Sequence, residues 1–447
     1  MFEHYSDEPV YNVKAVAHQT GIAPATLRAW ERRYGVPSPP RTDSGYRLYS
    51  ERDVAIVRWL KSQIENGMSI SQAVHLLRSL EAHATDGQTG EAAVERLLSE
   101  SPASYQRLHD EVIAGATDFD EAHIEYVLAE AFSLFPLEDV CLNLIQPVLV
   151  TLGDKWRLGE INISVEHFAT NIMRRKLLAL MAASPPVSRE ERIVSGCAPG
   201  EYHELGILII SLFLRRRGYG VIYLGQNISA LRFEEMLLKT QPDLLLLSAS
   251  GLVAAANLLD VAEGLHRRFA QPGTAIAFGG RVFNALPKLR RRVPGLYVGD
   301  DAQAATHQVV ELLADKAARS MPQASYAPVD AETLAAVDVV QRLRHEIIAA
   351  TARLLESHAQ HGLLHKQLFQ AVEHVLQVIA SALRFGEPDV LSNWTHWTWD
   401  ALPPDGISGA QLRQITQALA EAMGSVLPSP ERDRLQPYFQ AIQKAFD

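Results

Sequence analysis

The chain has 447 residues, 47% of them hydrophobic and 21% charged, and its formal net charge is −10. This length predicts roughly three or four domains, and the composition supplies enough apolar residues for several cores. The acidic balance excludes a protein that is basic throughout, although a local basic patch is sufficient to bind nucleic acid.

The sequence carries no signal for a membrane or for secretion. No apolar run reaches the length of about 18 residues that a membrane span needs, and the N-terminal stretch MFEHYSDEP lacks the basic and apolar regions of a signal peptide. We therefore expect a cytoplasmic protein. Cys141 and Cys197 are isolated in the sequence, and we expect both to be reduced core residues.

The first predicted unit, residues 9–80, is helical and rich in arginine. Its pattern predicts a short helix over Val13–Thr20, a turn, and a second helix over Pro24–Tyr34. Residues 37–49 predict a two-stranded wing with a glycine-containing turn, and a further helix is predicted to begin near Ser50. A second helix followed by a wing is the arrangement with which helix-turn-helix proteins contact DNA.

Residues 24–49 carry five arginines against Glu31 and Asp43, a local net charge of +3. An arginine-rich helix alone is equally well explained as a solvated surface helix. The pattern ATLRAWERRYG followed by GYRLYSERDV, however, resembles the DNA-binding domain of the MerR family. The resemblance implies a winged helix-turn-helix that binds inverted-repeat operators in double-stranded DNA as a dimer. The DNA contacts expected from it are Arg28, Arg32, Arg41, Tyr46 and Arg47.

Composition and periodicity divide the rest of the chain. Residues 81–92 are small and polar, which indicates a linker. Repeated helical spacing of apolar residues over 93–186 predicts a four-helix bundle. Short apolar runs alternate with amphipathic segments over 187–318, which predicts an α/β Rossmann-like domain with a parallel sheet. After a second linker, residues 319–329, the section 330–447 predicts an all-α domain.

The segment Glu201-Tyr202-His203-Glu204-Leu205-Gly206 follows the first predicted strand of the α/β section. His203 is therefore expected at the carboxyl end of that strand, where open α/β sheets bind ligands. A neutral imidazole is a good ligand for a transition metal, and either Glu201 or Glu204 could orient it. Gly206 would let a bulky group pass close to the backbone. A histidine in such a loop, taken alone, is more often a surface or capping residue.

Two further segments follow predicted strands in the same way. Ser248 ends one strand and can hydrogen-bond a ligand, and Gly279-Gly280 ends the next and is expected to leave a slot. Together these segments resemble the B12-binding domain of methionine synthase, the corrinoid mutases and related carriers. That pattern is Asp-x-His-x-x-Gly, Ser-x-Leu and Gly-Gly, with Glu201 here in place of Asp and Ser250 in place of Leu. The resemblance implies base-off binding of cobalamin, its nucleotide tail in the sheet and His203 as the lower cobalt ligand.

The predicted bundle contains Trp156 and, after nine intervening residues, Glu166-His167. A tryptophan in a bundle is most simply a core residue, but this spacing resembles the light-sensing B12 regulators of the CarH and CarA type. Their MerR-type, bundle and B12-binding modules also follow in this order. The resemblance implies adenosylcobalamin as cofactor, with Trp156 packed on the adenosyl group, Glu166 holding its ribose and His167 beside them.

The same resemblance implies a homo-oligomer, a dimer or tetramer, that represses its operator in the dark and dissociates when light breaks the cobalt–carbon bond. Well-matched members have a cobalt-ligating histidine directly after the tryptophan, and here that position is Arg157. Arginine has no lone pair to donate, so His167 or water remains for the upper site after photolysis. A MerR-like sensor of cobalamin concentration without a light switch stays an alternative. A corrinoid carrier or enzyme component is less favoured, because it leaves the DNA-binding module unexplained.

The section 330–447 has no counterpart in the three-module regulators. It resembles the added helical domain of photocobilins, which implies biliverdin as a second chromophore. The section contains no cysteine, so a bilin would be held non-covalently, and haem with a histidine ligand is another option. An oligomerisation or capping bundle is the simpler interpretation. The aromatic and imidazole residues that suggest a pocket are Trp394, Trp397, Trp399, His345, His358, His361, His365, His374 and His396.

Overall fold

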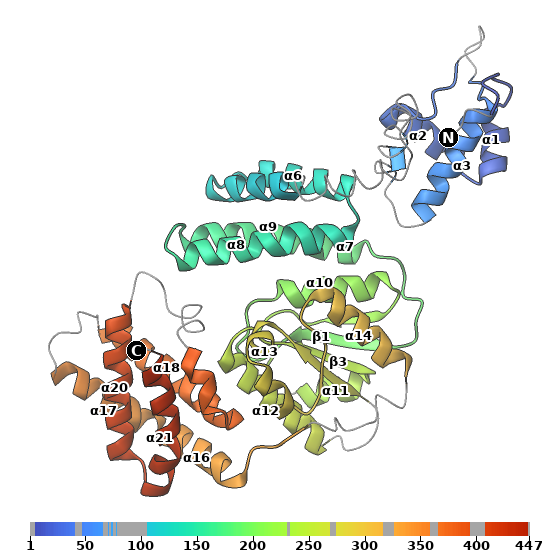
Figure 1. The fold of residues 1–447 in the computed structure, drawn as a ribbon. Helices are drawn as coiled ribbons and strands as arrows, with labels where there is room; N and C mark the ends of the chain where they lie inside the picture. Colours follow the sequence, from blue (N-terminus) through green and yellow to red (C-terminus); the bar gives the residue numbers. More distant parts are fainter. Residues whose placement is uncertain are drawn as a thin grey trace. The chain divides into compact units, whose positions relative to one another are not determined.

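A computed structural model gives the fold of the chain in two compact units, which are described separately (Figure 1). The first unit comprises Met1–Leu152 and Ser164–Ile172, and the second comprises Gly153–Ile163 and Met173–Asp447. Several predicted features lie outside the described residues: Arg41, Tyr46, the first linker, Trp394, Trp397, Trp399, His358, His361 and His396. The described residues are 5–40, 47–65, 70, 73–74, 77, 105–229, 233–268, 274–315, 326–357, 365–393 and 407–445.

The N-terminal helices have the predicted bounds, α1 over Val13–Thr20 and α2 over Pro24–Tyr34. Local capping explains both. The Asn12 side chain accepts a hydrogen bond from the first turn of α1, and Gly21 closes that helix with a φ of 70°. α3 follows over Glu51–Glu65, and Tyr11 and Tyr49 form an antiparallel bridge at the base of the wing. The core of this part includes Val16, Leu27, Trp30, Tyr49 and Leu60.

The bundle comprises four helical segments connected by short turns. The ring of Phe119 lies 5.2 Å from that of Phe168, and Nε2 of His109 lies 2.9 Å from Oγ1 of Thr151. A π-helical turn interrupts the third segment just before Pro147, whose ring cannot donate a backbone hydrogen bond. The segments are 105–117; α6, Glu121–Leu134; α7, Leu137–Val140, continued by the π-turn Cys141–Ile145 and α8, Gln146–Arg157; and α9, Ile163–Ala182.

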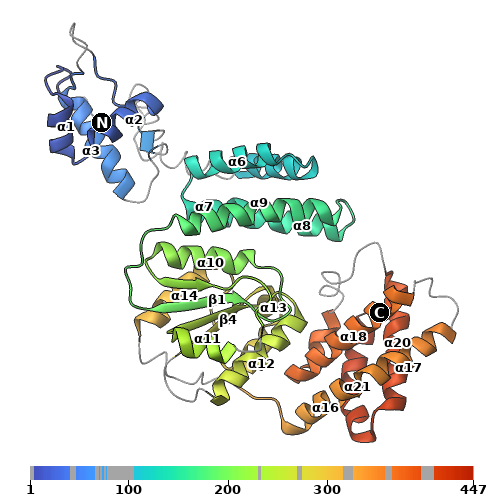
Figure 2. The same ribbon diagram turned by 180° about the vertical axis from the view of Figure 1, so that it is seen from behind.

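The second unit contains a five-stranded sheet in the order β2-β1-β3-β4-β5, and every pairing is parallel. This confirms the predicted Rossmann-like fold class. Apolar side chains alternate between the two faces, so that α10 and α14 cover one face while α11, α12 and α13 cover the other (Figures 1 and 2). The strands are β1, Arg192–Cys197; β2, Gly220–Tyr223; β3, Leu244–Ser248; β4, Ala275–Gly279; and β5, Leu296–Tyr297. The helices are α10, Leu205–Arg216; α11, Phe233–Thr240; α12, Leu252–Arg268; α13, Arg281–Ala285; and α14, Ala302–Ala314.

The C-terminal helices share one hydrophobic core with the α12 face of the sheet. α18 packs directly on α12, so the two predicted domains are joined by apolar burial as well as by the chain. Two 3₁₀ turns, Pro287–Arg292 and Pro388–Asn393, are joined by an ion pair between Lys288 and Asp389 at 2.9 Å. The helices are α16, Ala331–Arg342; α17, Arg344–Ser357; α18, His365–Phe385; α20, Gly409–Val426; and α21, Ser429–Lys444.

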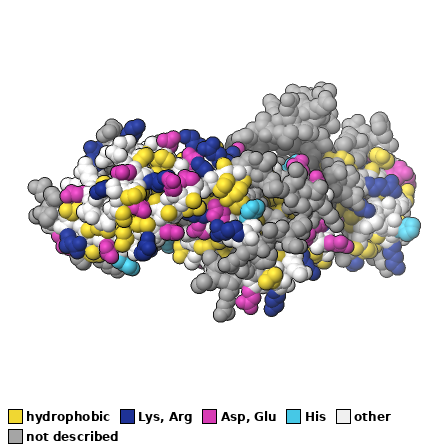
Figure 3. Space-filling model, turned by 90° about the horizontal axis from the view of Figure 1, so that it is seen from below, with side chains coloured by type: hydrophobic (Ala, Val, Ile, Leu, Met, Phe, Trp, Pro, Cys, Tyr) yellow, Lys and Arg dark blue, Asp and Glu magenta, His cyan; other side chains and the backbone are white. Residues whose placement is uncertain are grey.

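Charged groups reinforce the contact between α18 and α12. Nε of Arg384 lies 2.7 Å from Asp260, and Nη2 lies 2.8 Å from Glu263. The Tyr326 hydroxyl also donates to Glu263, at 3.2 Å. On the face seen in Figure 3, acidic and basic side chains are interspersed over the described part of the molecule. Within the described residues, no helix is both long and apolar enough to span a membrane.

Candidate functional site

Three of the predicted segments meet at one edge of the sheet. The loop with His203 follows β1, Ser248 ends β3, and Gly279-Gly280 follows β4. Cys197 pairs in register with Ser248, and Ser248 with Gly279, so these carboxyl ends are adjacent. The strand order reverses direction between β1 and β3, and an open α/β sheet forms its ligand crevice at such a point.

His203 is held by the buried carboxylate of Glu201. The Nδ1 atom of His203 lies 2.7 Å from Oε1 of Glu201, and the His203 backbone N–H donates to the same oxygen at 2.8 Å. The Ser250 backbone N–H donates to the other carboxylate oxygen. Because a carboxylate accepts hydrogen bonds, Nδ1 carries the proton and the imidazole lone pair is on Nε2. Glu201 is therefore the orienting partner of the two glutamates considered.

The imidazole and its carboxylate differ sharply in exposure. The side chain of His203 is 65% exposed, whereas that of Glu201 is 3% exposed. Burial alone would raise the pKa of Glu201, but the hydrogen bonds that Glu201 accepts from His203 and from the Ser250 backbone hold that pKa below its usual range. Burial and the nearby charges of Glu201 and Glu204 raise the pKa of the Cys197 thiol, so it stays protonated. Cys141 and Cys197 are both buried and are not joined in a disulfide, as predicted.

The glycines of the motif have different structural roles. Gly280 has a φ of 114°, and a Cβ there would lie 2.1 Å from the Ala249 carbonyl oxygen. Gly280 is thus required by the close approach of the protein's own backbone. A Cβ on Gly279 would meet Val298 at an ordinary 3.7 Å. A Cβ on Gly206 would meet no atom within 4 Å, so the backbone beside His203 is open to a bulky group.

The surroundings of His203 fit a metal ion whose other ligands come from a bound molecule and not from protein side chains. Within the described residues, no group of three or more His, Cys, Asp or Glu side chains could hold a metal ion. A single exposed imidazole with a buried carboxylate partner is suited to one axial position of a metal already bound in a macrocycle.

Glu204 anchors the same loop through a separate network. Its side chain is 2% exposed. Nε of Arg174 and the Tyr223 hydroxyl each donate to it at 2.5 Å, and the Gln226 amide donates at 2.8 Å. Sequence reasoning did not single out Arg174, because nothing in its neighbourhood on α9 indicates a partner 30 positions away. Only the folded chain brings the two together.

The residues predicted for the upper face lie on α8 and α9. Trp156 is half-buried near the end of α8, and the following Arg157 pairs with Asp154 at 3.6 Å. Glu166 lies in the first turn of α9, where it accepts hydrogen bonds from Nδ1 of His167 at 2.7 Å and from the Thr170 hydroxyl at 2.8 Å. Each carboxylate oxygen retains acceptor capacity beyond these bonds.

Arg281 connects the end of α8 electrostatically with the carboxyl edge of the sheet. It directly follows Gly280 at the start of α13. Its charge interacts with Glu201 and also with Asp154 and Arg157. Arg157, the position that carries arginine in place of the expected histidine, and Glu201 therefore both interact electrostatically with Arg281.

The described DNA-contact candidates lie on α2 and the base of the wing. Arg28 is exposed on α2, with its Nε donating to the Pro24 carbonyl at 3.1 Å. Nε of Arg47 lies 2.6 Å from Glu31, which also accepts from the Tyr49 hydroxyl. Arg47 thus ties the wing to α2 in addition to any contact with phosphate. Arg32 lies in α2, and its side chain is outside the described residues.

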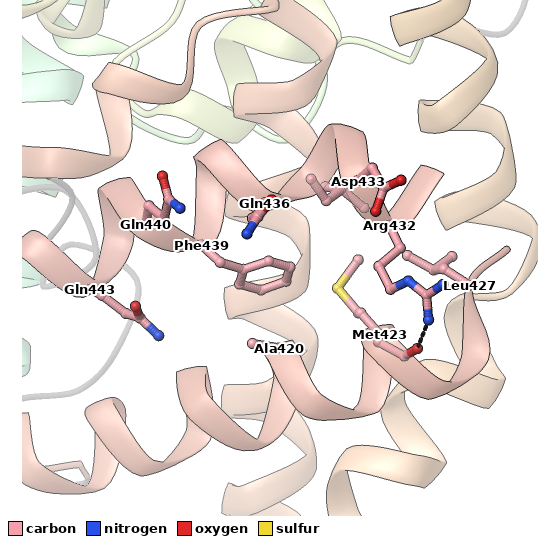
Figure 4. Close-up of a pocket in the computed structure, with 11 residues that line it drawn as sticks. Ala420, Met423, Leu427, Arg432, Asp433, Gln436, Phe439, Gln440 and Gln443 are labelled. Carbon is pink, nitrogen blue, oxygen red and sulfur yellow. Dashed lines mark hydrogen bonds between the residues drawn. The ribbon is translucent and has the colours of Figure 1, made fainter. Parts of the chain in front are cut away.

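A separate hollow of about 450 Å³ lies between α20 and α21 (Figure 4). Phe439 and Met423 form its apolar wall, and Arg432 donates to the Gly424 carbonyl at 3.0 Å. No histidine is among the described residues that line it. The hollow is therefore distinct from His374 on α18, whose Nε2 is buried and has no hydrogen-bond partner within the described part of the chain.

Three protein-family models match consecutive parts of the chain. Residues 11–80 match the MerR HTH family of regulatory proteins. Two models of a B12 binding domain match residues 108–181 and residues 191–308. These matches cover the winged-helix part, the bundle and the α/β domain.

Two curated proteins of Myxococcus xanthus are similar over most of their length. The HTH-type transcriptional repressor CarH is 30% identical over 273 residues, which are 61% of this chain and 89% of CarH. The HTH-type transcriptional repressor CarA is 31% identical over 260 residues, or 58% and 83% of the two chains. The solved monomethylamine corrinoid protein of Methanosarcina barkeri is 17% identical with a TM-score of 0.40, covering 46% of this chain and 96% of its own.

Proposed function

Since this chain belongs to the family of the HTH-type transcriptional repressors CarH and CarA, we propose that it represses transcription in response to light through adenosylcobalamin. It is a B12-binding transcriptional repressor of the MerR type, a regulator and not an enzyme. The observation that carries the ligand proposal is the exposed imidazole of His203 on its buried carboxylate at the carboxyl edge of the sheet.

His203 is the proposed lower ligand of cobalt, in the base-off, His-on arrangement. The hydrogen bond from Nδ1 to Glu201 directs the lone pair to Nε2 and increases the basicity of the ring. Glu201 is itself held by the Ser250 backbone, so the imidazole has little freedom to turn away. We assign the nucleotide tail to the neighbouring strand ends, with Gly206, Ser248, Ser250, Gly279 and Gly280 as binding residues.

Trp156, Glu166 and His167 are the proposed upper-face residues. When bound, adenosylcobalamin would supply a cobalt–carbon bond that light cleaves. The indole of Trp156 would exclude water from that face, and Glu166 would accept hydrogen bonds from ribose hydroxyls. Arg157 cannot ligate a metal, which leaves His167, whose side chain is 67% exposed, or water for the upper site after photolysis.

The DNA contacts proposed for the winged helix are Arg28, Arg32, Arg41, Tyr46 and Arg47. Basic side chains on the second helix and wing would grip phosphates and base edges of a double-stranded operator. The resemblance to the MerR family implies binding to inverted repeats as a dimer, so we propose that the repressor acts as a homo-oligomer, either a dimer or a tetramer. Light would act by weakening that assembly.

The light switch predicts a difference in operator affinity between two states of the same holo-protein. A DNA fragment selected from a random-sequence library by the dark adenosylcobalamin form serves as the operator. We expect green light to weaken its binding roughly 10-fold or more, within the range of allosteric coupling. Gel-shift titration and size-exclusion chromatography before and after illumination give the two measurements.

Hydroxocobalamin provides the matched control, because it lacks the light-sensitive cobalt–carbon bond. Its complex should be indifferent to illumination. Operator binding by the adenosylcobalamin form that survives green light unchanged would remove the light switch. Binding that rises with cobalamin concentration and ignores light would instead establish the concentration sensor.

We further propose that residues 330–447 bind biliverdin non-covalently. The buried Nε2 of His374, without a partner in the described part of the chain, supports this assignment. Burial lowers the pKa of His374, so the ring stays neutral and can exchange a hydrogen bond with a tetrapyrrole.

Adding biliverdin to the full chain is expected to produce a red-absorbing band that His374→Ala shifts or removes. His307→Ala, at an exposed position of α14 outside this section, is the matched control and should leave the band unchanged. If no such band forms with the wild-type chain, the section serves as an oligomerisation bundle, and chromatography of the dark and light forms would measure its contribution.

A further inference from the structure

The carboxylate of Glu204 is buried beside the proposed cobalt ligand and belongs to no part of the ligand assignment above. With a side chain 2% exposed, it depends on its donors for stability as an anion. One donor is the guanidinium of Arg174, and the others are the neutral groups of Tyr223 and Gln226. Among the described side chains that donate to Glu204, Arg174 is thus the only one that carries a charge.

Glu204 also occupies a position that sets the path of the His203 loop. It is the residue before the first turn of α10, and its backbone carbonyl accepts from Leu208 at 2.9 Å. A carboxylate is favoured at a helix N-terminus by the helix dipole. His203 is therefore held between two buried carboxylates: Glu201 turns the ring, and Glu204 holds the backbone that carries it.

Arg174 lies on α9, the helix that begins with the proposed upper-face residue Glu166. The two residues are eight positions apart on one uninterrupted helix, a rise of about 12 Å. A helix of this kind is stiff over two turns. A displacement of α9 along or about its axis would therefore reach Glu204 through the Arg174 hydrogen bond.

We propose that Arg174 is a positioning residue for the lower ligand. Through its hydrogen bond to Glu204, it couples the position of α9 to the position of His203. The inference rests on the proposed ligation of cobalt by His203. Arg174 would thus have a role in ligand positioning in addition to any role in the packing of α9. Arg174 does not touch the metal; it constrains the loop from which the ligand projects.

The test compares Arg174→Ala, Arg174→Lys and Arg175→Ala in the full-length chain reconstituted with adenosylcobalamin. Arg174→Ala is expected to weaken cobalamin binding about 10-fold, the lower end of the effect of partners that orient a metal ligand. It should also convert part of the bound cofactor from the base-off, His-on absorption spectrum to one without the histidine ligand. Arg174→Lys should restore most of both readouts, since it keeps a cation at the position. Arg175→Ala removes the neighbouring charge and should match wild type.

A second experiment changes Glu204, the partner of Arg174. Glu204→Gln keeps the shape of the acceptor and removes its charge, and combined with Arg174→Ala it should add little further effect if the two act as one unit. A purely structural role would lower the unfolding temperature of these variants and leave the spectrum of the bound fraction as in wild type. That result would overturn the inference.

Different results would refute the proposed ligation of cobalt by His203 and the positioning role of Arg174. If wild type and His203→Ala give the same cobalamin spectrum, the lower ligand is misassigned and the role of Arg174 falls with it. If wild type has the His-on spectrum and Arg174→Ala shares it with unchanged affinity, only the positioning role is refuted.

Discussion

Replacing His203 with alanine should abolish the base-off, His-on spectrum of bound cobalamin and weaken its binding by about 100-fold or more. Partners that merely orient a metal ligand contribute about 10- to 100-fold in affinity, and loss of the ligand itself should exceed that. The effect should also be specific to ligation, because the side chain of His203 is 65% exposed and contributes little packing to the fold. Titration followed by absorption spectroscopy measures spectrum and affinity together.

His307→Ala is the matched control for that experiment. His307 lies on α14, its side chain is 74% exposed, and it pairs with Glu311 one helical turn away at 3.6 Å. We expect it to bind cobalamin as wild type does. A His203→Ala protein with an unchanged base-off spectrum would show that another residue ligates cobalt, and the Glu201–His203 pair would then need a different explanation.

Replacing Arg384 with alanine should lower the free energy of unfolding of the second unit by about 3 kcal/mol or more. The Arg384 side chain is 11% exposed and that of its partner Glu263 is 9% exposed. Removing the guanidinium leaves a buried carboxylate whose remaining partners among the described residues are the Tyr326 hydroxyl and, at the longer distance of 3.7 Å, Arg267. It also loosens the α18–α12 contact, where the C-terminal helices share their core with the sheet domain.

Urea unfolding of the full chain, followed by far-ultraviolet circular dichroism, measures this loss as a lower midpoint. Arg342→Ala, at an exposed position near the end of α16, is the control and should stay within about 0.5 kcal/mol of wild type. If Arg384→Ala behaves like the control, the Arg384 pairs contribute no more than surface ion pairs do, and apolar packing alone holds the two parts together.

The parts of the fold that depend on neighbours in sequence were predictable. α1 and α2 have their predicted bounds because Asn12, Gly21 and Pro24 act within one helical turn of the helix ends they define. The parallel sheet was predictable for a related reason, since alternation of apolar strands and amphipathic helices leaves few other arrangements. The expected carboxyl-end positions of His203, Ser248 and Gly279 follow from that same alternation.

The roles of individual site residues were less predictable. Glu201 and Glu204 flank His203 in the sequence and were equivalent candidates for its partner. The fold separates them, because the chain turns so that one carboxylate faces the imidazole and the other faces α9 and β2. Nothing near Gly280 in the sequence predicts that the backbone of Ala249, about 30 positions earlier in the chain, excludes a Cβ at this position.

The sequence by itself determined the modular order, the local helices and strands, and the identity of the residue type that can ligate a metal from the sheet edge. Tertiary structure alone decided that Glu201 orients His203, that Arg174 holds Glu204, and that Arg384 fastens the C-terminal helices to α12. The physical reason is the range of the interactions. Caps and periodicity act within a few residues, whereas Arg384 and Asp260 are 124 positions apart and become neighbours only when apolar burial brings their helices together.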